Sequence, residues 1–116
     1  MKPGQYDLTI YQGADLDLPM TWQSDAEMVY DLSSHTARLQ VRANKDSTTV
    51  LLEMTSQGGQ IVLAAVSPNI KLVLTAAVTA LITWTEGVYD LELVEPGGKV
   101  IRLLEGLARV SGEVTR

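Results

Sequence analysis

Apolar and polar residues alternate with a period of two along most of this 116-residue chain. Because successive side chains of an extended strand point to opposite faces of a sheet, this alternation predicts half-buried β-strands. In "ADLDLPMTW", for example, Leu16, Leu18 and Met20 share one face and Asp15 and Asp17 share the other. The pattern predicts strands over residues 6–12, 14–22, 36–42, 49–55, 61–66, 70–74, 87–94, 99–106 and 107–116.

Residues that favour turns separate the predicted strands. Gly58 and Gly59 in "SQGGQ" are expected to take positive φ, and "EPGG" predicts a type II turn with Pro96 at i+1 and Gly97 at i+2. Short strands that recur about every ten residues are typical of an antiparallel sandwich or barrel. We therefore expect an all-β protein that forms one domain over residues 1–116.

Two features depart from plain alternation. "TAAVTALI" predicts one short helix near 75–82, capped by Thr75, because alanine and leucine favour helix and threonine favours the N-cap. Pro19 cannot donate a hydrogen bond to a neighbouring strand, so its strand is expected at a sheet edge or a bulge.

Composition excludes several classes of protein. The chain has no cysteine, so disulfides and thiolate metal sites are excluded. Its net charge is −5 and its basic residues are scattered, which argues against nucleic-acid binding and against docking on anionic membranes. No apolar run is long enough to cross a membrane, and "MKPGQYDL" lacks the apolar core of a signal peptide.

None of the residues that resemble catalytic groups forms a recognisable site. His35 follows Ser33 and Ser34 without nucleophile-elbow glycines, so we expect a turn residue exposed before a strand. Asp15 with Asp17, and Asp90 with Glu92, are expected on solvated strand faces, and Arg102 is a candidate cross-strand partner for one of the second pair. Gly97–Gly98 lie between strands and not before a helix, so they do not form a phosphate loop. We predict no enzyme, no catalytic residue, no cofactor and no metal site.

The aromatic residues leave a binding function open. Trp22 lies on an apolar strand face and is expected in the core, whereas Trp84 lies beside polar residues and is a candidate interface anchor. A platform of exposed aromatic side chains would suit a carbohydrate-binding module. A small enzyme such as a cell-wall hydrolase is a third alternative, and it would require carboxylates with perturbed pKa values that converge in a cleft.

Three segments resemble small proteins that are encoded among the tail genes of tailed bacteriophages: "YDLTIYQGADLDLPMTW", "YDLSSHTARLQVR" and "YDLELVEPGGKVIRLLEGLARVSGEVTR". They occur in the same order and cover nearly the whole chain, and the pattern departs from the family at Ser34. The N-terminal domains of baseplate and receptor-binding-protein adaptors have a similar layout. The resemblance implies an immunoglobulin-like β-sandwich and a structural role in the virion.

The expected function is therefore that of a bacteriophage virion protein in the tail, baseplate, tail tip or neck, made in the host cytoplasm, with a carbohydrate-binding module as the alternative. The expected partners are other virion proteins and copies of the same chain in a symmetric ring, with no nucleic acid and no membrane insertion. Contacts are expected at the loops 23–29, 43–48 and 95–99, and the candidate interface residues are Trp84, Asp25, Glu27, Asn44, Lys45, Pro96 and Gly97.

Overall fold

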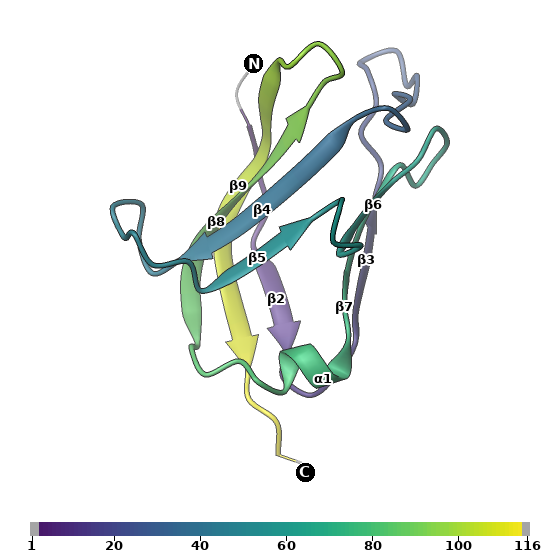
Figure 1. The fold of residues 1–116 in the computed structure, drawn as a ribbon. Coiled ribbons are helices and arrows are strands. Elements are labelled where there is room, and N and C mark those ends of the chain that lie inside the picture. The colour runs from purple at the N-terminus through teal and green to yellow at the C-terminus, as the bar shows by residue number, and fades with distance from the viewer. Residues whose placement is uncertain (1–2, 115–116) are drawn as a thin grey trace.

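A computed structural model describes residues 3–114. Nearly all regular structure is β (Figure 1). The strands are β1 (Gly4–Gln5), β2 (Leu8–Tyr11), β3 (Leu16–Met20), β4 (Thr36–Arg42), β5 (Leu52–Thr55), β6 (Ile61–Leu63), β7 (Ile70–Leu74), β8 (Glu86–Val94) and β9 (Val100–Ser111). One helical turn, α1 (Ala76–Thr79), lies between β7 and β8.

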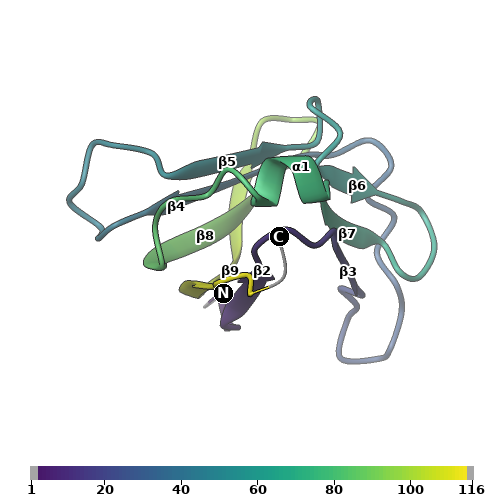
Figure 2. The same ribbon diagram turned by 90° about the horizontal axis from the view of Figure 1, so that it is seen from below.

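The strands form two sheets that pack face to face (Figure 2). The larger sheet, sheet A, has the order β1-β9-β8-β4-β5, with β2 following β1 along the same edge of β9. The smaller one, sheet B, has the order β3-β7-β6. In the immunoglobulin fold, strands B, E and D lie together in one sheet and strands C, F and G lie together in the other. Here β3, β7 and β6 take the places of B, E and D, and β4, β8 and β9 take those of C, F and G. The strand order is thus immunoglobulin-like, which confirms the predicted β-sandwich.

Sheet A is mixed rather than purely antiparallel. β1 and β2 run parallel to β9, with Gly4 opposite Leu104 and Leu8 opposite Ala108. The other neighbours in both sheets are antiparallel. The first and last strands of the fold therefore lie side by side and point the same way (Figure 1).

The alternation in the sequence builds the core between the sheets. Along β8, Tyr89, Leu91 and Leu93 are buried while Asp90 and Glu92 point outward, as predicted. Leu39 of β4 lies opposite Leu91 and both are fully buried. Burying a leucine side chain stabilises a fold by about 1.5–3 kcal/mol, so these inward residues supply most of the driving force for folding.

Four local predictions need correction. β9 is one continuous strand, so Gly106 does not end a strand; residues 115 and 116 of the predicted last strand lie outside the described residues. The turn at "EPGG" places positive φ at Gly98 (φ 96°) and not at Gly97, and in "SQGGQ" only Gly59 has positive φ. The helix is shorter than predicted, although Thr75 does cap it by accepting a hydrogen bond from the Val78 backbone N–H.

Candidate functional site

One side of the sandwich is open between β1 of sheet A and β3 of sheet B. A groove with a volume of about 540 Å³ lies there, between the edges of the two sheets. In immunoglobulin domains the first strand pairs with the second at this edge. Here β1 and β2 pair with β9 instead, so within residues 3–114 β3 has a partner strand on one side only. The groove therefore occupies the place of a missing strand, and Pro19 does lie on an edge strand as predicted.

Apolar side chains of both sheets line this open-edge groove. Ile70 and Leu103 belong to the core and are 1% and 7% exposed, so the floor of the groove reaches the interior. Leu18, Met20, Trp22 and Leu104 line it as well and pack partly buried against the core. An apolar groove that continues into the core binds apolar side chains by the hydrophobic effect.

A β-bulge in β9 supplies two adjacent leucines to the groove. The register between β8 and β9 shifts after Leu91, so that Leu91 pairs with Leu104 and Glu92 pairs with Arg102. Leu103 is therefore the additional residue of the bulge. Because a bulge interrupts the alternation, Leu103 and Leu104 both contact the core side of the sheet.

Tyr6 stands at the rim, where the edge strand is interrupted between β1 and β2. A Cβ atom on Gly106 would collide with the Tyr6 carbonyl oxygen, so this close approach requires glycine. The buried Tyr89 hydroxyl donates a hydrogen bond to the same oxygen, and burial raises the pKa of Tyr89 far above its usual range. These contacts fix the Tyr6 backbone, while its side chain is 43% exposed beside the groove.

Asn69 fixes the wall of the groove opposite Tyr6, which Trp22 helps to form. Its fully buried side chain accepts a hydrogen bond from the Trp22 N–H at 2.8 Å and donates to the carbonyl oxygens of Trp22 and Tyr30, both at 2.9 Å. The rings of Trp22 and Tyr30 pack with their centroids 4.3 Å apart. Both walls are thus positioned before any partner arrives.

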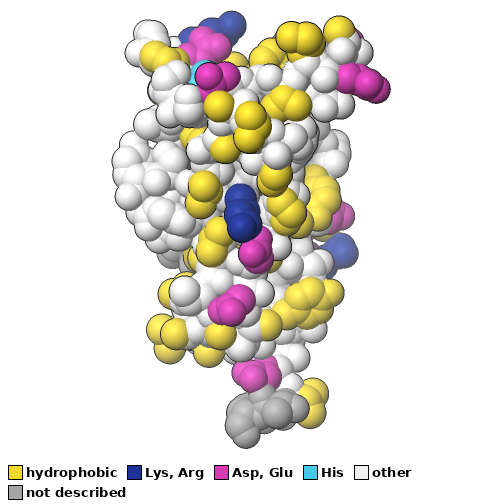
Figure 3. Space-filling model, turned by 90° about the vertical axis from the view of Figure 1, so that its right-hand side faces the viewer, with side chains coloured by type: hydrophobic (Ala, Val, Ile, Leu, Met, Phe, Trp, Pro, Cys, Tyr) yellow, Lys and Arg dark blue, Asp and Glu magenta, His cyan; other side chains and the backbone are white. Residues whose placement is uncertain are grey.

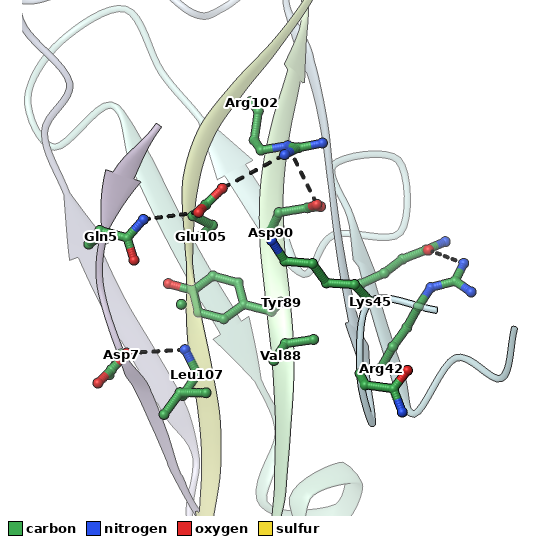
Figure 4. Close-up of a pocket in the computed structure, with 13 residues that line it drawn as sticks. Gln5, Asp7, Arg42, Lys45, Val88, Tyr89, Asp90, Arg102, Glu105 and Leu107 are labelled. Carbon is green, nitrogen blue, oxygen red and sulfur yellow. Dashed lines mark hydrogen bonds and ion pairs between the residues drawn. The ribbon is translucent and has the colours of Figure 1, made fainter. Parts of the chain in front are cut away.

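A second hollow, of about 450 Å³, lies on the outer face of sheet A, and most of the residues that line it are polar or charged (Figure 4). We call it the polar hollow. Arg102 lies between two acids in it, 3.7 Å from Asp90 and 3.8 Å from Glu105. Burial and the neighbouring carboxylates of Glu92 and Glu105 raise the pKa of Asp90, while Arg102 opposes them. The arrangement neutralises charge across a strand face, and the predicted pairing of Arg102 with an acid is confirmed.

The predicted interface residues lie in separate parts of the molecule. Loops 23–29 and 95–99 lie toward the end of the sandwich at the top of Figure 1, whereas loop 43–48 projects from its left side. Trp84 packs partly buried against the core. The other candidates are exposed, and their role in binding stays a prediction: Asp25, Glu27, Asn44, Lys45, Pro96 and Gly97.

The residues weighed for catalysis make structural contacts. Ser33 donates its hydroxyl and its backbone N–H to Asp31, which lowers the pKa of Asp31. His35 is half-buried rather than exposed, and its buried Nδ1 has no hydrogen-bond partner. The outward carboxylates of Asp17 and Glu92 pair with Lys71 at 3.4 Å and with Arg38 at 2.7 Å.

Within residues 3–114 no group of three or more His, Asp or Glu side chains is placed to hold a metal ion. Over the same range no helix has the length and apolar character needed to cross a membrane.

The open-edge groove was not predicted from the sequence, although two features of the sequence indicated it. Pro19 marked an edge strand, and the adjacent leucines at 103 and 104 broke the alternation near the C-terminus. That β1 would pair with β9 and not with β3 depends on Gly106 and Tyr89, which are 100 and 83 residues away from Tyr6.

No family model and no curated protein matches this chain. Among solved structures, this chain is similar to the extracellular domain of the voltage-gated sodium channel beta4 subunit, which is described as a parallel homodimer with a role in cell–cell adhesion. The TM-score is 0.48 and the sequence identity is 14%, and the match covers 100% of this chain and 92% of that one. Extracellular domains 3–5 of Drosophila OTK are similar at a TM-score of 0.39 and 17% identity, over 92% of this chain and 33% of that one.

These comparisons correct the predicted function. Both structures are extracellular domains of eukaryotic proteins and neither is a bacteriophage tail protein, so the predicted function as a structural protein of the bacteriophage tail is contradicted. The resemblance of the three sequence segments to tail proteins, and the cellular location that it implies, stay predictions. The chain is an immunoglobulin-like β-sandwich with one open edge.

Proposed function

We propose that this domain acts by binding another polypeptide, without catalysis, and that its open-edge groove is the binding surface. The observation that carries the proposal is the apolar groove beside the unpaired edge of β3, which reaches Ile70 and Leu103 in the core. Such an edge offers backbone hydrogen bonds and apolar contacts at the same place, which is how sheets recruit further strands. A second copy of the chain is one class of partner.

Photo-crosslinking tests the proposal. A benzoylphenylalanine residue at position 6, beside the groove, is compared with one at position 11 on β2, because both positions hold an exposed tyrosine and Tyr11 does not line the groove. We expect position 6 to capture a polypeptide several-fold more efficiently than position 11. Mass spectrometry identifies the captured polypeptide, and it is then purified.

The purified partner gives the decisive measurement. We expect Tyr6→Ala to raise the dissociation constant of the complex with this partner at least tenfold, and Tyr11→Ala to leave that constant unchanged. Equal capture at positions 6 and 11, or equal affinity of the two alanine variants, would overturn the proposal.

A further inference from the structure

The occupant of the open-edge groove can be specified further, on the assumption that the proposed function holds. The segments that border the groove are acidic. Residues 3–27, which include β1, β2 and β3, contain no lysine or arginine and five carboxylates, which lie outside the lining of the groove itself: Asp7, Asp15, Asp17, Asp25 and Glu27. Charges of one sign along a surface attract a partner of the other sign and reject like-charged competitors.

Within residues 3–114, the basic groups near this edge are already paired. Lys71 lies opposite Pro19 on β7 and its Nζ is 3.4 Å from Asp17. Arg102, next to Leu103 on β9, lies between Asp90 and Glu105. Neither leaves a free positive charge beside the groove to attract an acidic partner.

The outer face of sheet B carries little charge besides this pair. Pro19, Val62 and Val73 lie around Lys71 and Asp17 on neighbouring strands. Figure 3 looks onto this side and shows hydrophobic side chains on both sides of a central basic group. A strand added beside β3 would continue this face and would meet the Asp17 carboxylate, which stays 62% exposed although it pairs with Lys71.

The shape of the site specifies an extended partner. β3 spans five residues, and within residues 3–114 no strand pairs with it on its groove side. A segment of similar length can therefore pair with this edge, except that Pro19 has no N–H to donate. Alternate side chains of that segment would point inward onto Leu103, Leu104 and Ile70, and the others would point out beside Asp17. The inward positions therefore call for apolar side chains and the outward ones for basic side chains.

We infer that the open-edge groove binds an extended segment in which apolar and basic residues alternate, and that this segment adds a fourth strand to sheet B beside β3.

Synthetic nine-residue peptides test this inference. The set comprises alternating Val/Lys, alternating Val/Glu, alternating Val/Ser, and a block peptide with the valines and lysines of the first in two separate runs. Binding is followed by amide NMR shifts of the full chain. We expect Val/Lys to bind at least tenfold tighter than Val/Glu and the block peptide at low salt, with the largest amide shifts in residues 16–18, 20, 103 and 104. The preference over Val/Glu should shrink as salt rises, because ions screen exposed charges.

Protein variants separate the contributions of shape and charge. Tyr6→Ala should weaken Val/Lys binding several-fold, while Tyr11→Ala serves as the matched control and should leave it unchanged. Asp17→Asn should reduce the preference for Val/Lys over Val/Glu without abolishing binding. Each variant is exposed at the substituted side chain, so loss of folding is not expected, and the NMR spectrum checks it.

The inference is overturned by any of three results: Val/Glu binding as tightly as Val/Lys, shifts confined to the polar hollow of sheet A, or no binding of any peptide at millimolar concentration. It is also overturned if sedimentation shows that a second copy of the chain fills the groove. If position 6 still captures a polypeptide while the peptides show no basic preference, the proposed function stands and only the partner chemistry is wrong.

Discussion

Tyr89 is the residue whose chemistry most directly links the fold to the groove. Its hydroxyl donates to the Tyr6 carbonyl oxygen from a position that is 5% exposed. The pKa of Tyr89 is raised chiefly because burial disfavours the charged phenolate, and to a smaller extent by the negative potential of Tyr6 and Asp7. A group whose pKa is higher in the folded than in the unfolded state contributes stability that is complete below its unfolded pKa, about 10 for tyrosine, and is lost as pH rises.

This sign gives a pH prediction. The free energy of unfolding should fall more steeply above about pH 10 in the wild type than in Tyr89→Phe, by at most about 1.4 kcal/mol per pH unit for one proton. At pH 7 the variant should be less stable by about 1 kcal/mol, because the Tyr6 carbonyl loses a donor. Urea unfolding followed by circular dichroism at pH 7 to 11 measures both. Parallel curves would show that Tyr89 does not titrate through folding, and the exposed Tyr6, Tyr11 and Tyr30 are common to both proteins.

At the scale of elements, the hairpin between β8 and β9 was predicted correctly, but the glycine with positive φ in its turn was not. The Gly98 N–H donates to the Glu95 carbonyl at 2.8 Å, and Gly98 takes φ 96°. Gly97, one residue earlier, has no positive φ and open space around its Cβ position. The two glycines therefore have different conformational requirements, although both lie at the tip of the same turn.

Alanine substitution should separate the two glycines. Gly98→Ala should lower the free energy of unfolding by about 1 kcal/mol, since alanine is strained at positive φ. Gly97→Ala should leave it unchanged or raise it by a few tenths of a kcal/mol, because alanine restricts the unfolded chain. Thermal unfolding of the two variants measures the difference, and the reverse ranking would support the type II turn that the sequence predicted.

Local patterns in the sequence account for most elements and for few of the contacts between them. Alternation predicted the inward Leu91 and outward Asp90 correctly, because the period of a strand is written in neighbouring residues. It divided β9 at Gly106, because a glycine between two strands and a glycine that admits the distant Tyr6 carbonyl look the same in one dimension. The groove was missed for the same reason, since it depends on which strand β1 pairs with.

At the scale of the whole molecule, the two sheets differ in how many of their strands have a partner on both sides. β8 and β4 are central in sheet A and paired along their whole length, whereas β3 and β6 are the edges of a three-stranded sheet. Regions with fewer neighbours open at a lower free energy than the core does.

Hydrogen exchange should show this difference. Amides of β4 and β8 should exchange last, near the rate set by global unfolding, and those of β3 at least tenfold faster. Binding of the Val/Lys peptide should slow the β3 amides selectively. Uniform protection across both sheets would contradict the assignment of β3 as an open edge.

The parallel pairing of β1 and β2 with β9 has a mechanical consequence. Because these strands run the same way, the chain enters the sandwich at one end and leaves it at the other (Figure 1). A pulling force applied at the two ends would draw the first and last strands past each other lengthwise, so the hydrogen bonds between them would share the load rather than break one after another. Pulling on the two ends would thus load these hydrogen bonds in shear.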